Sequence, residues 1–278
     1  MADTASIILS SATNSSTRPH TVAKRFAIPY TSSRDKLALA SLTMPYSIPN
    51  VSVTLRNTGG FQYRWVDGVV YDVVYPGGSY SVSDLQFFAE NVMANNGHYL
   101  LKDGSVKQFF LEFRTNQIYY SVTLTVSAVP TVLAANQTNP NSIPLNGKVP
   151  QVIIAPEPNT WGRLLGYEAG SYPPTLSTLP QQYNGTLAPV ISPIVAINVL
   201  CNWIFDDRFS DRPSVLASFV PTGQFGETIQ YQPQNLVFLN IVSKQYYEIE
   251  VTFVDQDFQP IEFYDRNQIQ ISLLLQSN

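Results

Sequence analysis

Charged residues are scarce in this 278-residue chain: Asp, Glu, Lys and Arg make up 13% of it, against roughly a quarter of an average soluble domain. A protein that stays alone in solution needs surface charge, so this low content favours a surface covered by neighbouring subunits. The 16 Tyr and 15 Phe residues point the same way, because aromatic residues are enriched in protein–protein interfaces. An aromatic-rich β core explains them equally well.

Cysteine and histidine are almost absent, which argues against several kinds of chemistry. The single Cys201 rules out an intramolecular disulfide, and its apolar neighbours Val199 and Leu200 are typical of a small buried hydrophobic residue. His20 and His98 lie far apart in the sequence and have no metal-ligand spacing. We therefore expect no zinc site, no catalytic Cys201–His98 pair, no cofactor and no enzymatic activity.

Export and membrane signals are also missing. Asp3 stands where a signal peptide carries positive charge, and the apolar run at residues 7–9 is too short for its core, so we expect no secretion through a signal peptide. The longer apolar run at residues 188–205 contains Pro189, Pro193, Asn198 and Asn202. It predicts buried strands rather than a membrane-spanning helix.

The densest charge cluster lies at residues 206–212. Its three carboxylates, Asp206, Asp207 and Asp211, could bind a hard cation such as calcium. Arg208 and Arg212 are close enough to neutralise them, so the cluster favours a salt-bridged loop between strands. The net charge of −4 argues against a dedicated nucleic-acid-binding protein.

Alternating apolar residues predict β-strands along most of the chain. Two C-terminal runs, at residues 247–253 and 269–275, are separated by turns rich in Asp, Asn and Pro and predict an antiparallel meander. A second pair, at residues 109–113 and 118–126, predicts a hairpin that turns at Thr115-Asn116. About a dozen such short strands are typical of an all-β sandwich or jelly roll.

A single stretch shows helical spacing of apolar residues. These residues form one stripe: Leu85, Phe88, Ala89, Val92 and Met93. Ser83 with Gln86 predicts a capping box at the N-terminus, and Gly97 predicts a left-handed residue after the C-terminus. We expect a short amphipathic helix at about residues 83–95 that covers one end or edge of the sandwich.

Two parts are predicted along the chain, an N-terminal arm and one domain that contains a loop-rich region. Residues 1–36 hold five basic and two acidic residues, a balance of +3, whereas the remainder holds 11 basic and 18 acidic residues, a balance of −7. This basic, Ser/Thr-rich start predicts an extended arm that reaches a partner, with solvated disorder as the alternative. Residues 37–278 are predicted to form a single jelly-roll domain. Long Pro/Asn-rich loops, or an insertion, are expected at about residues 130–193.

Several spaced motifs occur in an order that resembles a viral protein family. They are YPGGSYSVSDLQFF from Tyr75, Met93 with residues 96–99, WGRLLGY at residues 161–167 with Tyr172-Pro173, PTGQFGE at residues 221–227, and the closing block at residues 254–275. Together they resemble the penton or minor capsid proteins of polinton-like viruses, adintoviruses and virophages, over roughly residues 37–275. The resemblance implies a jelly-roll penton subunit of an icosahedral double-stranded DNA virus, and no catalytic residues.

The resemblance also implies partners and a location. Five copies would form a homopentamer at each five-fold vertex and would contact a separate major capsid protein, and the arm would reach other minor capsid proteins. The protein would be made in the host cytoplasm or a virus factory and reside in the virion. Candidate subunit-interface residues are Trp161, Tyr167, Tyr172, Phe205 and Phe209, each of which could equally belong to the core. A receptor- or glycan-binding spike of the same fold is the alternative, and a hydrolase is the weakest hypothesis.

Overall fold

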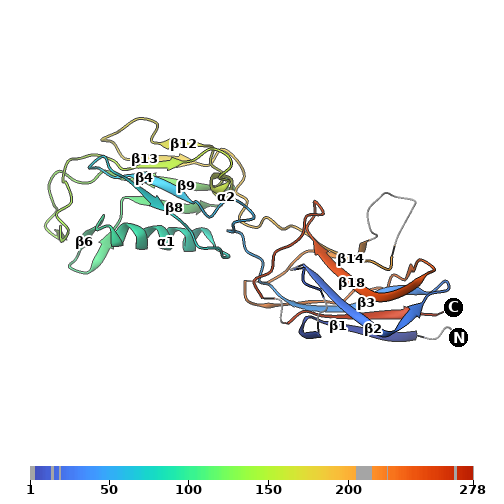
Figure 1. Cartoon of the computed structure of the whole chain (residues 1–278). Coiled ribbons are helices and arrows are strands. Elements are labelled where there is room, and N and C mark those ends of the chain that lie inside the picture. Colours follow the sequence, from blue (N-terminus) through green and yellow to red (C-terminus); the bar gives the residue numbers. More distant parts are fainter. Residues whose placement is uncertain are drawn as a thin grey trace. The chain divides into compact units, whose positions relative to one another are not determined.

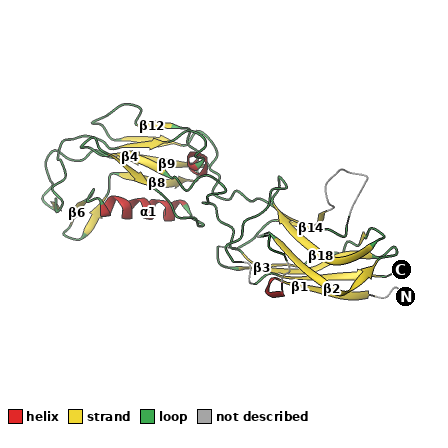
Figure 2. Cartoon of the chain, in the orientation of Figure 1, coloured by secondary structure: helices red, strands yellow, loops and turns green. Residues whose placement is uncertain are grey.

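The computed structural model describes residues 4–13, 16–18, 20–204, 215–223, 225–265 and 268–277. The chain divides into two compact units. Residues 1–49 and 194–278 form the first, which we call the terminal unit, and residues 50–193 form the second, which we call the inserted unit. Strands dominate both units, and the longest helix belongs to the inserted unit (Figure 2).

The terminal unit is built from strands of both ends of the chain. Their bounds are β1 (Thr4–Ser10), β2 (Thr21–Thr31), β3 (Lys36–Pro45), β14 (Ile197–Cys201), β15 (Val215–Phe219), β16 (Thr228–Tyr231), β17 (Leu239–Asn240), β18 (Gln245–Val254) and β19 (Gln270–Gln276), with a 3-10 turn η1 (Ser11–Thr13) after β1. In Figure 1 the blue early strands lie beside the orange and red late strands. The two ends of the sequence therefore fold together.

The strand order of the terminal unit identifies its topology. One sheet runs β1-β19-β3-β16, with β17 also on β3, and the other runs β15-β14-β18-β2, every pair being antiparallel. The chain passes repeatedly from one sheet to the other, so that most successive strands do not pair. A five-stranded and a four-stranded sheet connected in this way form a jelly roll. The predicted all-β jelly-roll class is confirmed.

Alternation along the strands places the core between these two sheets. Ile249, Val251 and Phe253 of β18 are buried, as are the inward residues of β19, which are Ile271, Leu273 and Leu275. The predicted C-terminal meander is wrong, however, because β18 and β19 belong to different sheets. Alternation in the sequence shows which residues of a strand face the core. It does not show to which of the two sheets the strand belongs.

The start of the chain also differs from the predicted extended arm. Residues 4–10 pair with β19, and residues 21–31 pair with β18, so both segments supply edge strands of the jelly roll. Leu9 and Val22 are buried in its core. The burial of these apolar side chains between the sheets gives the segment a structural role within the chain.

The inserted unit contains three sheets and two helices. Their bounds are β4 (Phe61–Arg64), β5 (Val70–Val73), α1 (Val82–Asn95), β6 (Leu100–Lys102), β7 (Val106–Gln108), β8 (Leu111–Asn116), β9 (Ser121–Val126), β10 (Gln137–Thr138), β11 (Gln151–Ile154), α2 (Trp161–Leu165), β12 (Gly170–Tyr172) and β13 (Gln181–Asn184). The sheets run β12-β11-β4-β5, β13-β9-β8 and β10-β6-β7. The first two share one hydrophobic core. The insertion expected at residues 130–193 therefore begins earlier, at residue 50.

Helix α1 packs along β8, an edge strand of the inserted unit, as expected of a helix that covers one edge of a sandwich. Its capping box is formed by Ser81 and Asp84, two residues before the predicted pair: the Ser81 Oγ accepts from the Asp84 N–H at 3.1 Å, and the Asp84 carboxylate accepts from the Ser81 N–H at 2.9 Å. Gly97 has φ +75°, as predicted. The Gln86 amide donates to the Leu111 carbonyl at 3.1 Å and accepts from the Phe113 N–H at 2.8 Å. These bonds satisfy edge groups of β8 that would otherwise invite another strand.

Asn50 closes the inserted unit on itself. Its side-chain nitrogen donates to the carbonyls of Tyr80 and Ile191 at 2.7 and 2.8 Å, and its side-chain oxygen accepts from the Tyr80 N–H at 2.8 Å. One buried amide therefore ties the first residue of the unit to a residue near its end. Such bonds hold the two ends of an insertion together without help from the rest of the chain.

Candidate functional site

The five candidate interface residues fall into three groups. Trp161 and Tyr167 are buried within the inserted unit, and Tyr172 is partly buried against the same core. Phe205 and Phe209 lie outside the described residues, as do the acidic residues of the 206–212 cluster. Only Tyr172 therefore has a described surface that another subunit could contact.

Trp161 is buried because a short helix carries it into the core. It begins α2, and its ring lies 4.8 Å from that of Phe61 and 5.7 Å from that of Phe113. Gly162 makes this close packing possible, because a Cβ there would lie 2.6 Å from the Tyr167 carbonyl oxygen. The first part of the WGRLLGY motif is thus a packing motif that joins α2 to both main sheets of the inserted unit.

Tyr167 is buried at the end of the same motif. Gly166 ends α2 with φ +80°, a left-handed conformation that favours glycine, and turns the chain so that Tyr167 points inward. The Tyr167 hydroxyl lies 2.7 Å from the Val122 carbonyl and 2.8 Å from the Tyr183 carbonyl, both at the second sheet of the unit. Burial raises the pKa of Tyr167 above its ordinary value. Tyr167 therefore acts as a hydrogen-bonded core residue.

Tyr172 keeps part of its surface accessible. Its ring lies edge-on to the rings of Tyr167 and Tyr183, at 5.3 and 5.4 Å, and its hydroxyl donates to the Glu168 carbonyl at 3.0 Å. It terminates β12, an edge strand of its sheet. Tyr172 stays a candidate for contact with another subunit.

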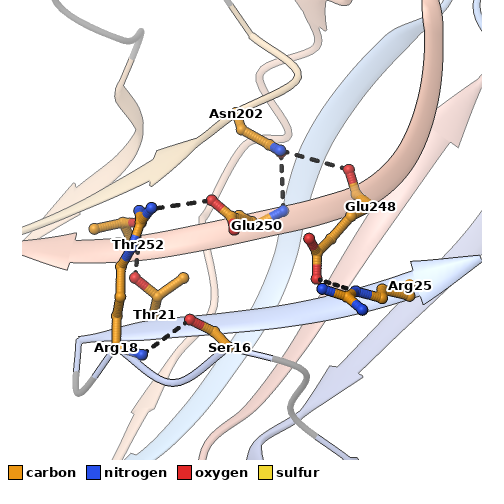
Figure 3. A network of polar contacts seen from close by, with 8 residues as sticks. All are labelled: Ser16, Arg18, Thr21, Arg25, Asn202, Glu248, Glu250 and Thr252. Carbon is orange, nitrogen blue, oxygen red and sulfur yellow. Dashed lines mark hydrogen bonds and ion pairs between the residues drawn. The ribbon is translucent and has the colours of Figure 1, made fainter.

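Two of the five basic residues of the chain start form ion pairs within the terminal unit (Figure 3). Arg18 lies 3.9 Å from the Glu250 carboxylate, and Arg25 lies 3.5 Å from that of Glu248. Asn202 accepts from the Glu250 N–H at 2.9 Å and lies across the same strand. The positive balance of residues 1–36 is thus partly matched by carboxylates of β18, its paired strand. These exposed pairs each contribute roughly 0–1 kcal/mol, so they orient side chains more than they stabilise the fold.

Two side chains of types common in catalysis, His98 and Cys201, are buried. His98 is enclosed by the rings of Tyr63, Trp65 and Tyr71, and burial lowers the pKa of His98 to about 4. Burial raises the pKa of Cys201 to about 12, so its thiol is not a reactive thiolate. Among the described residues, no group of three or more His, Cys, Asp and Glu side chains could hold a metal ion. No helix in the described ranges is long and apolar enough to cross a membrane.

The surface feature that sequence reasoning missed is the turn between β8 and β9. The strands pair as far as Asn116 and Ser121, so residues 117–120 form the turn, two residues later than the predicted Thr115-Asn116. Ile118, Tyr119 and Tyr120 are 85%, 69% and 84% exposed. Ile118 and Tyr120 continue the period-two alternation of β9, so Tyr119, a large residue at a position that should be polar, was the available signal.

A second exposed apolar position lies in the terminal unit. The β2–β18 pairing shifts register between Tyr246 and Glu248, so that β2 bulges opposite Tyr247. Ile28, within this bulge, is 83% exposed, and Tyr247 is 64% exposed. A bulge twists an edge strand and re-aims its side chains, and here it turns an isoleucine toward solvent.

Comparisons with known proteins were made with family models, curated proteins and solved structures. No family model matches the chain. No curated protein matches it either. Among solved structures, the crystal structure of the mavirus penton protein aligns over the whole length of both chains, with a TM-score of 0.45 and 14% sequence identity. The jelly roll is established here by the strand order of the terminal unit.

Proposed function

We propose that this protein is a structural capsid protein of an icosahedral double-stranded DNA virus, and specifically a penton subunit. Five copies would form a ring at each five-fold vertex and contact the major capsid protein. The observation that carries the proposal is the jelly roll formed by residues 1–49 and 194–278. This fold is common in capsid proteins. The spaced motifs that resemble penton and minor capsid proteins support the same role.

The physical basis of this function is assembly through weakly charged surfaces. Only 13% of the residues carry charge, and the exposed apolar side chains include Ile28 and Tyr247 in the terminal unit. Burial of such side chains between subunits is favourable in proportion to the apolar area removed from water. A five-fold ring uses one pair of complementary faces five times and then closes. Of the five candidate interface residues, Tyr172 is the one with a partly exposed side chain in the described part of the chain, and we propose that it lies in one of these faces.

A receptor- or glycan-binding module of the same fold is the second candidate function. The turn at residues 117–120 favours it, because it presents two tyrosine rings to solvent. Tyrosine supplies a large contact area with few rotatable bonds and is common in recognition loops. Under this alternative the protein would bind a soluble receptor or sugar without forming rings.

The oligomeric state of the purified protein separates these candidates. Sedimentation velocity and negative-stain electron microscopy should show five-membered rings if the protein is a penton subunit. A trimer or a monomer that binds a glycan would support the second candidate and contradict the first. Turnover of a small molecule, lost on changing Asp206, Asp207 or Asp211, would contradict both and support a hydrolase.

A further inference from the structure

The β8–β9 turn forms a protruding apolar tip at one end of the inserted unit. We call residues 117–120 the tip. The antiparallel pairing of β8 with β9 ends at Asn116 and Ser121, so the four residues of the tip extend beyond the sheet. Ile118, Tyr119 and Tyr120 are all largely exposed. Leaving three large apolar side chains in water is unfavourable, and exposed apolar groups of this kind mark surfaces that contact something else.

The tip is held in place by a polar base. The Asn116 side-chain oxygen accepts from the Tyr119 N–H at 3.3 Å, and its nitrogen donates to the Thr123 hydroxyl at 3.2 Å. The Thr123 hydroxyl in turn donates to the Asn184 side-chain oxygen at 2.6 Å, which connects the hairpin to β13. These hydrogen bonds restrain the backbone of the turn in the folded chain. Less conformational entropy is then lost when the exposed residues bind a partner.

Backbone strain at the tip supports a functional role. Tyr120 has φ +47°, in the left-handed region that a bulky residue adopts only at an energetic cost. A glycine or asparagine would fit this position without that cost. The presence of a tyrosine with an exposed ring at a strained position indicates that its side chain is needed there.

The chemistry of the tip identifies its partner. Residues 115–125 carry no charge, and the charged residue that comes before them in the sequence, Arg114, is ion-paired with Glu112. An uncharged, convex group of one isoleucine and two tyrosines suits a surface that is apolar inside and polar at its rim. Tyrosine prefers the bilayer interface, where its ring enters the apolar region and its hydroxyl stays hydrated. We propose that the tip inserts into the interfacial region of a zwitterionic lipid bilayer.

This contact is a binding function separate from capsid assembly and does not depend on it. The insertion is shallow, because the apolar residues are confined to one turn. A single copy would therefore bind reversibly, as peripheral anchors with a small apolar area do. The absence of basic residues from the tip predicts that anionic lipid is not needed for binding.

A fluorophore at the tip tests the proposal on the full chain. Tyr119→Cys can be labelled with an environment-sensitive dye, because the native Cys201 is buried and protected. With phosphatidylcholine vesicles in excess, we expect a blue shift and quenching by lipid-attached quenchers. The matched control is Val132→Cys, a 78% exposed position of the same unit, whose dye should not respond. An unresponsive Tyr119→Cys dye, or an equal response at Val132→Cys, would overturn the proposal.

Variants of the native side chains give a second test by vesicle flotation. Ile118→Ser with Tyr120→Gly removes the apolar groups while glycine preserves the turn, and partitioning should fall roughly tenfold. Val53→Ser with Val132→Ser removes two equally exposed valines elsewhere in the unit and should leave it unchanged. A dye at Tyr119 that is already shielded without lipid would show that a protein surface covers the tip, which also contradicts insertion. Sedimentation of the same samples measures the oligomeric state. Failure of the lipid-binding proposal can therefore be distinguished from failure of the penton proposal.

Discussion

At the scale of single residues, the most constrained titratable group is His98. Its ring stacks on Trp65 at 4.4 Å between centroids and meets the ring of Tyr71 edge-on at 4.6 Å. The Asn96 amide donates to the Tyr63 oxygen at 2.9 Å, and the Tyr63 hydroxyl is hydrogen-bonded to Nδ1 of His98 at 2.9 Å. Burial lowers the pKa of His98 to about 4, and the negative charge of Asp67 only partly offsets this effect. His98 thus joins the end of α1 to β4 as a neutral group.

Stability should therefore fall in acid through His98. Its pKa is about 4 when folded and about 6.5 when unfolded, so the unfolded chain binds the proton first. The loss begins as the pH drops below about 6.5, is complete once the pH has fallen through about 4, and should reach roughly 3 kcal/mol. Urea unfolding at pH 7 and pH 4.5 measures it.

A matched pair of variants isolates this effect from the protonation of carboxylates. His98→Phe should show a smaller drop in unfolding free energy between the two pH values than the native chain. His20→Asn should show the native drop. Equal drops in all three proteins would mean that His98 does not titrate as the structure requires.

Tyr167 tests whether the WGRLLGY motif belongs to the core or to an interface. Tyr167→Phe removes the hydroxyl that bonds to the carbonyls of β9 and β13, which should cost about 1 kcal/mol of unfolding free energy. Its sedimentation profile should match that of the native protein, because Tyr167 is 2% exposed. If Tyr167→Phe changed the oligomeric state but not the unfolding free energy, Tyr167 would be an interface residue.

At the scale of elements, helix α1 protects the edge of β8 through one side chain. Gln86→Met keeps the packing volume but leaves the Phe113 N–H and the Leu111 carbonyl without their partner, and should cost about 2 kcal/mol. Hydrogen exchange at the Phe113 amide should accelerate in step.

The control for this prediction is Glu90→Ala. Glu90 accepts a third bond from the Gln86 amide at 2.8 Å and takes no part in the two bonds to Leu111 and Phe113. Exchange at Phe113 should stay at the native rate in this variant. Native exchange in Gln86→Met would show that the side chain does not seal the strand.

The elements differ in how far sequence predicts them. Helix α1 and its terminal Gly97 were predictable because a helix is specified by neighbours three and four residues apart. Strand pairing is specified by distant residues: β1 pairs with β19, with Thr4 opposite Gln276. Local alternation therefore predicts strands such as β18 and β19 but not their separate sheets. The turn at residues 117–120 was predicted two residues too early. Ile118 and Tyr120 continue the apolar alternation of β9, so the pattern places them in the strand although the pairing begins at Ser121.

The candidate interface was predictable only in part, for a related reason. Aromatic residues serve cores and interfaces alike, and the loop-rich sequence around Trp161 and Tyr167 gave no sign that α2 carries them inward. Ion pairing of Arg18 and Arg25 with β18 was likewise invisible without the β2–β18 register. The sequence did predict an all-β jelly roll poor in charge.

At the scale of the whole molecule, the chain consists of a jelly roll that is interrupted by a second folded unit. The unit boundaries at residues 49–50 and 193–194 each follow a proline, and no change of composition marks the first of them. The inserted unit has its own core and its ends are tied together by Asn50. A unit with these properties can fold by itself.

Residues 50–193 expressed alone should therefore unfold cooperatively, with dispersed amide signals by NMR. Asn50→Ala in this fragment should lose roughly 2–3 kcal/mol, because the backbone groups of Tyr80 and Ile191 lose a buried partner. Asn146→Ala, which removes a single bond to the Val66 carbonyl, should lose less. A fragment that stays unfolded would contradict the independence of the unit.

The measurement that tests the proposed capsid role most directly is electron cryo-microscopy of purified virus particles that contain the protein. The account predicts density for five copies around each five-fold axis, with the strand order β1-β19-β3-β16 and β15-β14-β18-β2 in each jelly roll and the folded inserted unit attached to it. Vertices occupied by another protein, with this chain absent from the shell, would contradict it.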